Sequence, residues 1–259
     1  MKKVLTIAGS DCSGGAGIQA DIKTITAHKM YAMSAITALT AQNTTGVYGI
    51  LDAGADFVGL QLDCIFQDIY PDAVKIGMVA NKDIIKMIAN KLVEYKAKNI
   101  VADPVMVSTA GSRLMEEDAS TVLIEKLLPL ATIITPNLPE AEVLCNFPIK
   151  NQDDCIKAAE TIAKKIPTAI LIKGGHLSDT ADDLLWNNSS VHWFKGERID
   201  NPNTHGTGCT LSSAIASNLA AGHDLVTSIQ NAKNYITGAL KDGLNLGKGS
   251  GPLNHMYNL

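Results

Sequence analysis

The residues best suited to chemistry form a run of small and polar types, Asn203-Thr204-His205-Gly206-Thr207-Gly208-Cys209-Thr210, directly before an apolar helical pattern. Gly206, Thr207 and Gly208 leave backbone N–H groups exposed at a helix N-terminus, where the partial positive charge of the helix favours a phosphate. Cys209 falls on the first turn, where the same field is expected to lower the pKa of its thiol. A lone cysteine is more often an inert core residue, but its position behind such a loop favours a chemical role.

A second glycine-rich run, Gly9 to Gly17, leads from a strand pattern into a helix pattern, and Gly15 to Ala20 has the GxGxxA spacing of dinucleotide-binding proteins. A nicotinamide-binding unit also needs an acid about twenty residues further on to hold the ribose. No acid occurs between Asp21 and Asp52, and no Gly-Lys pair is followed by Ser or Thr. The sequence therefore argues against a dehydrogenase and against a Walker A loop, and a tight turn remains the alternative role of these glycines.

Oxygen ligands and a lysine follow three later strand patterns. Asp103 precedes a proline, Asn137 and Glu140 stand three residues apart at a helix start, and Lys173 opens the run Lys173-Gly174-Gly175-His176. Carboxylate and amide oxygens suit Mg²⁺, often through water, with phosphates completing its shell. Each group also has a structural alternative: a turn for Asp103, a capping box for Asn137 and Glu140, and a solvated loop position for Lys173.

These residues are positioned by an alternation of short β-branched runs with longer helical patterns, which predicts an α/β fold with a mostly parallel sheet. The predicted strands are 4–8, 34–39, 73–76, 100–102, 132–135 and 168–172, and a hairpin is predicted from 181–186 and 191–194. The predicted helices are 15–28, 55–69, 82–96, 116–127, 153–165, 208–221 and 225–245. The absence of a linker or repeat predicts one domain over residues 1–259.

Ligands of an open parallel sheet bind outside the carboxyl ends of its strands. The residues that follow the predicted strands are therefore expected to converge, namely Asp11, Gln42, Asn43, Gly77, Met78, Asp103, Asn137 and Lys173.

The amino-acid composition limits the classes of binding partner that the protein is expected to have. The 259 residues are 46% hydrophobic and 19% charged, and the net charge is -4. Without a basic run, capture of nucleic acid or of an anionic membrane is not expected, and a small-molecule partner is favoured. The five cysteines form no CxxC pair and no even disulfide framework, and the N-terminal apolar stretch is too short for a signal peptide or a membrane span. A cytoplasmic protein is expected.

Taken in order, these motifs resemble the ribokinase superfamily, and within it the hydroxymethylpyrimidine and phosphomethylpyrimidine kinases of thiamine biosynthesis. The resemblance covers nearly the whole chain. It is carried by Ala8–Asp21, Thr37–Thr44, Lys75–Met78, Asp103–Met106, Thr135–Ala141, Lys173–His176, Thr204–Thr210 and Gly247–Pro252.

The resemblance implies a ribokinase-like three-layer α/β/α sandwich, usually a homodimer. It implies an enzyme that uses ATP and Mg²⁺ to phosphorylate 4-amino-5-hydroxymethyl-2-methylpyrimidine and then its monophosphate. By the same similarity Gln42 pairs with the edge of the pyrimidine, and the ring is lined by Gly9, Asp21, Met78 and Val105.

The remaining site residues are also assigned by resemblance. Asp103 and Asn137 organise the phosphates and, with Glu140, the magnesium, while Lys173 meets ATP. Gly206, Thr207, Gly208 and Cys209 form the anion hole, and the Cys209 thiolate is a candidate base for the substrate hydroxyl. Most sugar kinases of the superfamily have aspartate at this position.

Two other functions stay open at this level. A pyridoxine or pyridoxal kinase on the same scaffold would act on a ring of similar shape. Some dual-function pyridoxal kinases carry a second cysteine just after the Asp-Pro-Val-Met stretch, where this chain has Val107-Ser108-Thr109-Ala110-Gly111, so the pyrimidine is favoured. A non-catalytic nucleotide-binding protein is the alternative from another class.

Overall fold

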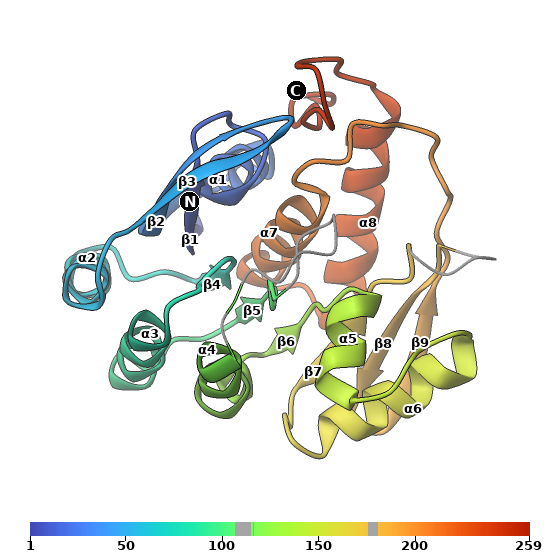
Figure 1. Ribbon diagram of the computed structural model, residues 1–259, viewed down its shortest axis with the longest axis horizontal. Helices are drawn as coiled ribbons and strands as arrows, with labels where there is room; N and C mark the ends of the chain where they lie inside the picture. Colours follow the sequence, from blue (N-terminus) through green and yellow to red (C-terminus); the bar gives the residue numbers. More distant parts are fainter. Residues whose placement is uncertain (107–114, 116, 176–180) are drawn as a thin grey trace.

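The computed structural model describes residues 1–106, 115, 117–175 and 181–259. In this part of the chain, nine strands form one sheet in the order β3-β2-β1-β4-β5-β6-β7-β8-β9 (Figure 1). Strands β2, β1, β4, β5, β6 and β7 run parallel, whereas β3, β8 and β9 join through antiparallel pairs. The strands are β1 (Lys3–Asp11), β2 (Tyr31–Asn43), β3 (Gly46–Asp52), β4 (Ala73–Ile76), β5 (Ile100–Ala102), β6 (Ile133–Ile134), β7 (Ala169–Ile172), β8 (Asp183–Asn187) and β9 (Ser190–Phe194).

Helices cover both faces of this sheet and complete three layers. One face carries α1 (Gly17–Ala27), α7 (Thr207–Ala221) and α8 (Leu225–Lys241). The other carries α2 (Ala55–Asp68), α3 (Lys82–Glu94), α4 (Glu117–Val122), α5 (Leu138–Cys145) and α6 (Gln152–Ala163). After α4 the chain continues as a π-helical turn, Leu123–Leu127, and a 3₁₀ turn, Leu128–Leu130.

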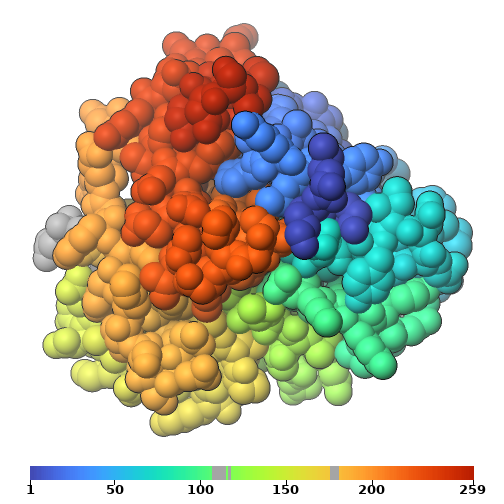
Figure 2. All heavy atoms as spheres, turned by 180° about the vertical axis from the view of Figure 1, so that it is seen from behind, coloured from blue at the N-terminus to red at the C-terminus, as the bar shows by residue number. Residues whose placement is uncertain are grey.

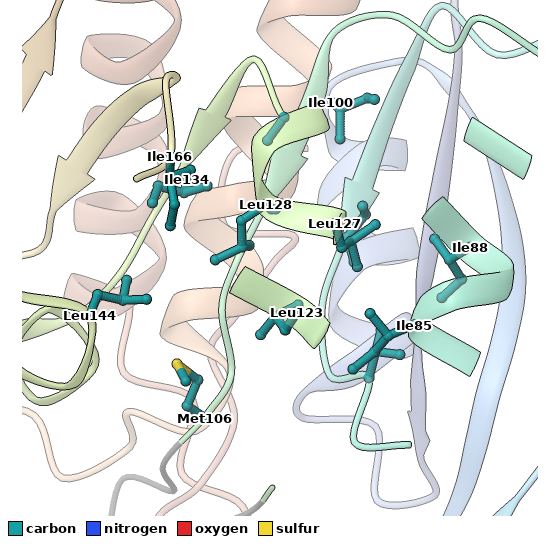
Figure 3. Packing of buried hydrophobic residues seen from close by; sticks show 14 of the residues in the cluster. Ile85, Ile88, Ile100, Met106, Leu123, Leu127, Leu128, Ile134, Leu144 and Ile166 are labelled. Atoms are coloured by element: carbon teal, nitrogen blue, oxygen red, sulfur yellow. The ribbon is translucent and has the colours of Figure 1, made fainter. Parts of the chain in front are cut away.

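The core explains why the inner strands read as continuous apolar runs. Strands β4, β5, β6 and β7 are buried along their whole length because both faces of the sheet are covered. Figure 3 shows one side of this core, where Ile85 and Ile88 of α3 lie near Leu123 and Leu127 of the π-helical turn. This packing holds the short strands rigidly, so the residues at their carboxyl ends are well positioned.

The expected fold class is confirmed, and most elements lie where the patterns place them. One strand is missed: β3 pairs antiparallel with the end of β2, so β2 continues to Asn43 beyond its predicted end. The pattern does not reveal β3 because its two faces are exposed and it contains Gly46 and Gly49. The last helix ends at Lys241, four residues before the predicted end at residue 245.

Candidate active site

The polar residues that follow the parallel strands converge beside the N-terminus of α7. Asp103 follows β5, Asn137 follows β6 and Lys173 follows β7, and an isolated parallel bridge joins Asn137 to Lys173. The register of neighbouring parallel strands brings such residues to one edge of the sheet.

The two glycine-rich runs meet at the start of α7. Gly206 is the N-cap, with φ of 86°, and a Cβ there would lie 2.0 Å from the Gly15 carbonyl oxygen. Only glycine fits such a backbone conformation and such close contact without strain. The first intrahelical hydrogen bond runs from Thr210 N to Gly206 O. The N–H groups of Gly208 and Cys209 therefore precede the helical ladder, as an anion site requires.

A largely buried ion pair, with Asp103 buried and Lys173 partly exposed, lies against this first turn. Lys173 Nζ donates to Asp103 Oδ1 at 2.9 Å, and Thr135 Oγ1 donates to the same oxygen at 3.2 Å. A Cβ at Gly208 would lie 3.1 Å from Asp103 Oδ2 and 3.5 Å from Lys173 Nζ. Burial works against the Lys173 charge, but Asp103 and Glu140 outweigh it and hold the pKa of the ammonium above its usual value. Lys173 therefore stays cationic beside the exposed amides.

Asn137 and Glu140 form the capping box that the spacing allowed. Asn137 Oδ1 accepts from Glu140 N, and Glu140 Oε2 accepts from Asn137 N, both at 2.9 Å. Glu140 Oε1 also accepts from Met106 N at 3.4 Å. Glu140 is buried, and this burial, with Asp103 nearby and Lys173 opposing, raises its pKa to about 7. The pair fixes the turn after β6, and its role as a metal ligand stays a prediction.

The expectation of a lowered thiol pKa at Cys209 is wrong. Cys209 is only partly exposed, and burial raises the pKa of its thiol. Lys75 and the Gly17 N–H favour the thiolate, but Asp21 and Asp103 oppose it. The loop sequence suggested only the helix field, whereas the surrounding packing decides the direction of the shift.

Asp21 differs from the pocket-lining role implied by resemblance. Its side chain is fully buried, with Oδ2 accepting from Thr6 and from Lys75 Nζ at 2.9 Å and Oδ1 accepting from Ser213 at 2.7 Å. Direct contact of this carboxylate with a ligand would require opening that network. Asp21, on α1, instead joins β1, β4 and α7 through Thr6, Lys75 and Ser213. Lys75 belongs to a motif of the resemblance, but the sequence predicts no role for it.

Three of the expected ring-lining residues lie at strand ends. A Cβ at Gly9 would lie 2.9 Å from Met78 Cε, so Met78 packs directly on the β1 backbone. Met78 and Val105 are partly exposed, and the Val105 N–H donates to the Asp103 carbonyl. Gln42, at the end of β2, has its Oε1 at 3.1 Å from Thr40 Oγ1.

Two polar residues beside Gln42 were not given a role from the sequence. His205 Nε2 lies 2.8 Å from Asp11 Oδ2 and 3.3 Å from Gln42 Nε2. In the sequence, Asp11 stands out only as a residue after the first predicted strand, and His205 only as a member of its loop. No local signal connects them, because 194 positions separate them in the chain. His176 and the discriminating stretch 107–111 lie outside the described residues.

Comparison with known proteins shows which family the chain is similar to. The family model described as phosphomethylpyrimidine kinase matches residues 11–254. A Geobacter sulfurreducens protein named thiamine biosynthesis bifunctional protein ThiED is 48% identical over 98% of this chain, which spans 52% of that protein. The chain thus covers about half the length of this relative.

Two solved structures are similar over nearly their whole length. A phosphomethylpyrimidine kinase from Clostridium difficile is 46% identical, with a TM-score of 0.84 over 92% of this chain and 98% of the other. An ADP complex of Bacillus subtilis pyridoxal kinase is 39% identical, with a TM-score of 0.91 over 99% of this chain and 98% of the other.

Proposed function

Because the chain belongs to the phosphomethylpyrimidine kinase family, we propose that it transfers the terminal phosphoryl group of ATP to 4-amino-5-hydroxymethyl-2-methylpyrimidine and then to the resulting monophosphate. The observation that carries this proposal is the contact of the Asp103–Lys173 pair with the first turn of α7 at Gly208. A cation and free helix amides in one place suit a transferring phosphate.

The chain's own groups would stabilise the charge that develops during transfer. The amides of Gly208 and Cys209 are fixed by the helix, so they need no reorientation when negative charge grows on the transferring oxygens. Lys173 is held by Asp103 at 2.9 Å and supplies a positive charge beside them. Phosphoryl transfer relies mainly on such alignment and electrostatic stabilisation.

Magnesium fits part of the predicted ligand set. Asp103 Oδ2 faces Gly208, next to the proposed position of the phosphates, whereas Asn137 Oδ1 and both Glu140 oxygens already accept backbone hydrogen bonds. Asp103 would therefore be the main protein ligand, with Asn137 and Glu140 acting through water. Held in this way, a magnesium ion would supply positive charge beside the phosphates of ATP.

The two phosphorylations place different demands on Cys209. The first acceptor is a hydroxyl that must lose a proton, and a Cys209 thiolate would take it. The second acceptor is a phosphate oxygen that is largely deprotonated at neutral pH. Since burial raises the thiol pKa, only a small fraction of Cys209 is available as a base at neutral pH.

A substrate panel tests the proposal. The protein is incubated with ATP, Mg²⁺ and, in separate reactions, hydroxymethylpyrimidine, its monophosphate or pyridoxine, and the products are resolved by mass. We expect the pyrimidine mono- and diphosphates as the main products. Absence of ATP consumption with every acceptor would favour a non-catalytic nucleotide-binding protein instead.

Pyridoxal is the second candidate acceptor, because the chain superposes on the Bacillus subtilis pyridoxal kinase with a TM-score of 0.91. A pyridine carrying a hydroxymethyl group presents the same nucleophile in a ring of similar size. A higher kcat/KM for pyridoxine or pyridoxal than for the pyrimidine would favour this alternative.

We further propose a homodimer that forms through the edge of the sheet at β3. Val47, Tyr48, Ile50 and Leu51 are all at least half exposed, with exposed fractions from 50% to 70%. An apolar edge strand that is exposed on both faces is suited to pairing with another strand.

One continuous sheet supports a single domain over residues 1–259. A cytoplasmic location stays a prediction; no helix among the described residues is long and apolar enough to cross a membrane.

A further inference from the structure

Three polar side chains from distant parts of the chain meet between the two glycine-rich loops. Asp11 ends β1, Gln42 lies near the end of β2, and His205 precedes α7. His205 Nε2 is 2.8 Å from Asp11 Oδ2 and 3.3 Å from Gln42 Nε2. The imidazole also lies on the backbone of Gly15, where a Cβ would be 2.5 Å from His205 Cδ2. The ring therefore has little freedom to move.

Asp11 decides which ring nitrogen of His205 carries the proton. Its buried carboxylate accepts N–H groups from Ser13 and Ala16 at 2.9 Å and from Gly15 at 3.2 Å. Although burial opposes ionisation, the hydrogen bonds from His205 and Ser13 hold the pKa of this carboxyl well below its usual range. An ionised carboxylate only accepts hydrogen bonds. His205 Nε2 must therefore bear a hydrogen and donate it to Asp11.

The protonated Nε2 in turn decides the orientation of the Gln42 amide. With Gln42 Nε2 towards His205, two N–H donors would face each other at 3.3 Å. The single O–H of Thr40 would also have to serve both Ser10 O, at 2.9 Å, and Gln42 Oε1, at 3.1 Å. Exchanging the amide oxygen and nitrogen removes the contact between two donors, because Gln42 Oε1 then shares the Nε2–H that His205 donates to Asp11. The exchange also leaves the Thr40 hydroxyl to donate to Ser10 O alone. Amide orientation is properly assigned from such a network.

We propose that His205, oriented by Asp11, is a specificity-determining positioning residue that holds the Gln42 amide with its oxygen towards His205 and its NH₂ towards Thr40. This inference rests on the proposed function, in which Gln42 meets the pyrimidine. The remaining N–H and lone pair of the amide then face the ligand in one order only. That order fixes the direction in which an aminopyrimidine edge, with an acceptor ring nitrogen beside a donor amino group, pairs with the amide. Without His205 only Thr40 orients the amide, and the discrimination weakens.

A matched pair of variants tests this role. In glutamine, Nε2 is as many bonds from Cβ as Nε2 is in histidine, so His205→Gln keeps an N–H donor near the same place. His205→Met has a similar length and no donor. Binding of hydroxymethylpyrimidine without ATP is measured by calorimetry, and KM, kcat and the preference over pyridoxine are measured with ATP. Thermal unfolding and ATP binding of each variant serve as controls.

We expect His205→Met to raise the Kd and KM for the pyrimidine roughly 3- to 10-fold, the range of one lost hydrogen bond, with kcat little changed. The preference of His205→Met for the pyrimidine over pyridoxine should also fall. For His205→Gln, the Kd and KM should stay within about twofold of the wild-type values. Equal losses in both variants with unchanged unfolding temperatures, or wild-type binding by His205→Met, would overturn the inference.

Two further variants keep the test decisive. Thr40→Val removes the hydroxyl at the other end of the amide, so it should also weaken pyrimidine binding if His205→Met does not fold; unchanged binding would contradict the inference. Gln42→Leu separates this inference from the proposed function. If Gln42→Leu binds the pyrimidine normally, the recognition role of Gln42 itself fails; if it binds weakly and His205→Met does not, only the role of His205 fails.

Discussion

At the scale of single residues, the chemistry of Cys209 depends on its surroundings more than on its place in the helix. The helix N-terminus favours a thiolate, yet burial and two nearby carboxylates raise the thiol pKa, and Lys75 offsets this only in part. The Lys75 charge is itself paired with Asp21 at 2.9 Å. Cys209 is therefore mostly a thiol at neutral pH before substrate binds.

The pH dependence of the first phosphorylation tests Cys209 as a base. The thiolate fraction rises up to tenfold per pH unit below the thiol pKa, so we expect kcat with hydroxymethylpyrimidine to rise between about pH 7 and pH 9. Cys209→Ala should abolish that rise and lower kcat about 10²- to 10⁴-fold. The monophosphate is the internal control, since its attacking oxygen needs no base. Equal losses for both acceptors would mean that Cys209 only shapes the loop.

The second prediction concerns Glu140 and the pH dependence of the free energy of unfolding. Its pKa of about 7 lies above the ordinary 4.5, so between these values the folded protein binds more protons than the unfolded chain. The free energy of unfolding should therefore fall as pH rises through this window, by up to about 3 kcal/mol. Glu140→Gln does not titrate, so urea unfolding at pH 4.5 and pH 8 should show its stability improving relative to the wild type at the higher pH. Glu160→Gln, at an exposed position of α6, is the control; a pH-independent difference for Glu140→Gln would contradict the assignment.

At the scale of elements, α7 connects the loop at residues 203–206 to the core. It packs against α1, α8 and strands β1, β4 and β5, and Thr210 in its first turn is hydrogen-bonded to the buried His255 at 2.9 Å. The C-terminal glycine-rich segment contacts the loop before α7 through the bond from His205 N to Gly251 O. It also contacts the turn after β2, because Lys248 N and Gly249 N donate to Thr44 Oγ1. Figure 2 shows this red C-terminal part against the blue N-terminal part.

The two ends of α7 supply a matched test of the loop contact. Gly206 and Gly222 both have positive φ, 86° and 96°, but an added Cβ meets the Gly15 backbone only at Gly206. We expect Gly222→Ala to cost about 1 kcal/mol of stability from conformation alone. Gly206→Ala should cost more and should also impair both phosphorylations, because the amides of the first turn shift. Chemical unfolding and steady-state rates measure the two effects; equal behaviour of the two variants would argue against a tight loop contact.

At the scale of the whole molecule, the exposed edge at β3 is the feature that an isolated chain leaves unexplained. The side chains of Ile50 and Leu51 point to opposite faces of the strand. Even so, the exposed fraction is 58% for Ile50 and 67% for Leu51. Phe57 and Leu60 on α2, the next element along the chain, are also more than half exposed. A second copy paired at this edge would satisfy the outer hydrogen-bonding side of β3 and cover part of these side chains.

Sedimentation velocity tests this dimer. We expect the wild type to sediment as a dimer and Ile50→Glu to sediment as a monomer, because a charge buried in an apolar interface is costly. Val143→Glu on α5 introduces the same charge at a position that is 51% exposed and far from β3 (Figure 1), and it should remain dimeric. A monomeric wild type would refute the dimer at this edge.

Much of this molecule follows from contiguous stretches of its sequence. Apolar runs and helical periodicity predict the alternating strands and helices, and the residues directly after the strands include Asp103, Asn137 and Lys173, which do meet at one edge. These properties are local, because each depends on a residue and its near neighbours. The family resemblance rests on the same contiguous motifs.

Only the tertiary structure decides how those residues are surrounded. The partners of Asp11 and Asp21, His205 and Ser213, lie 194 and 192 positions away along the chain. Such contacts place Asp21 in a sealed network, orient His205 and reverse the expected shift of the Cys209 pKa. Desolvation and charge pairing arise from packing between distant segments, and no pattern of neighbouring residues contains that information.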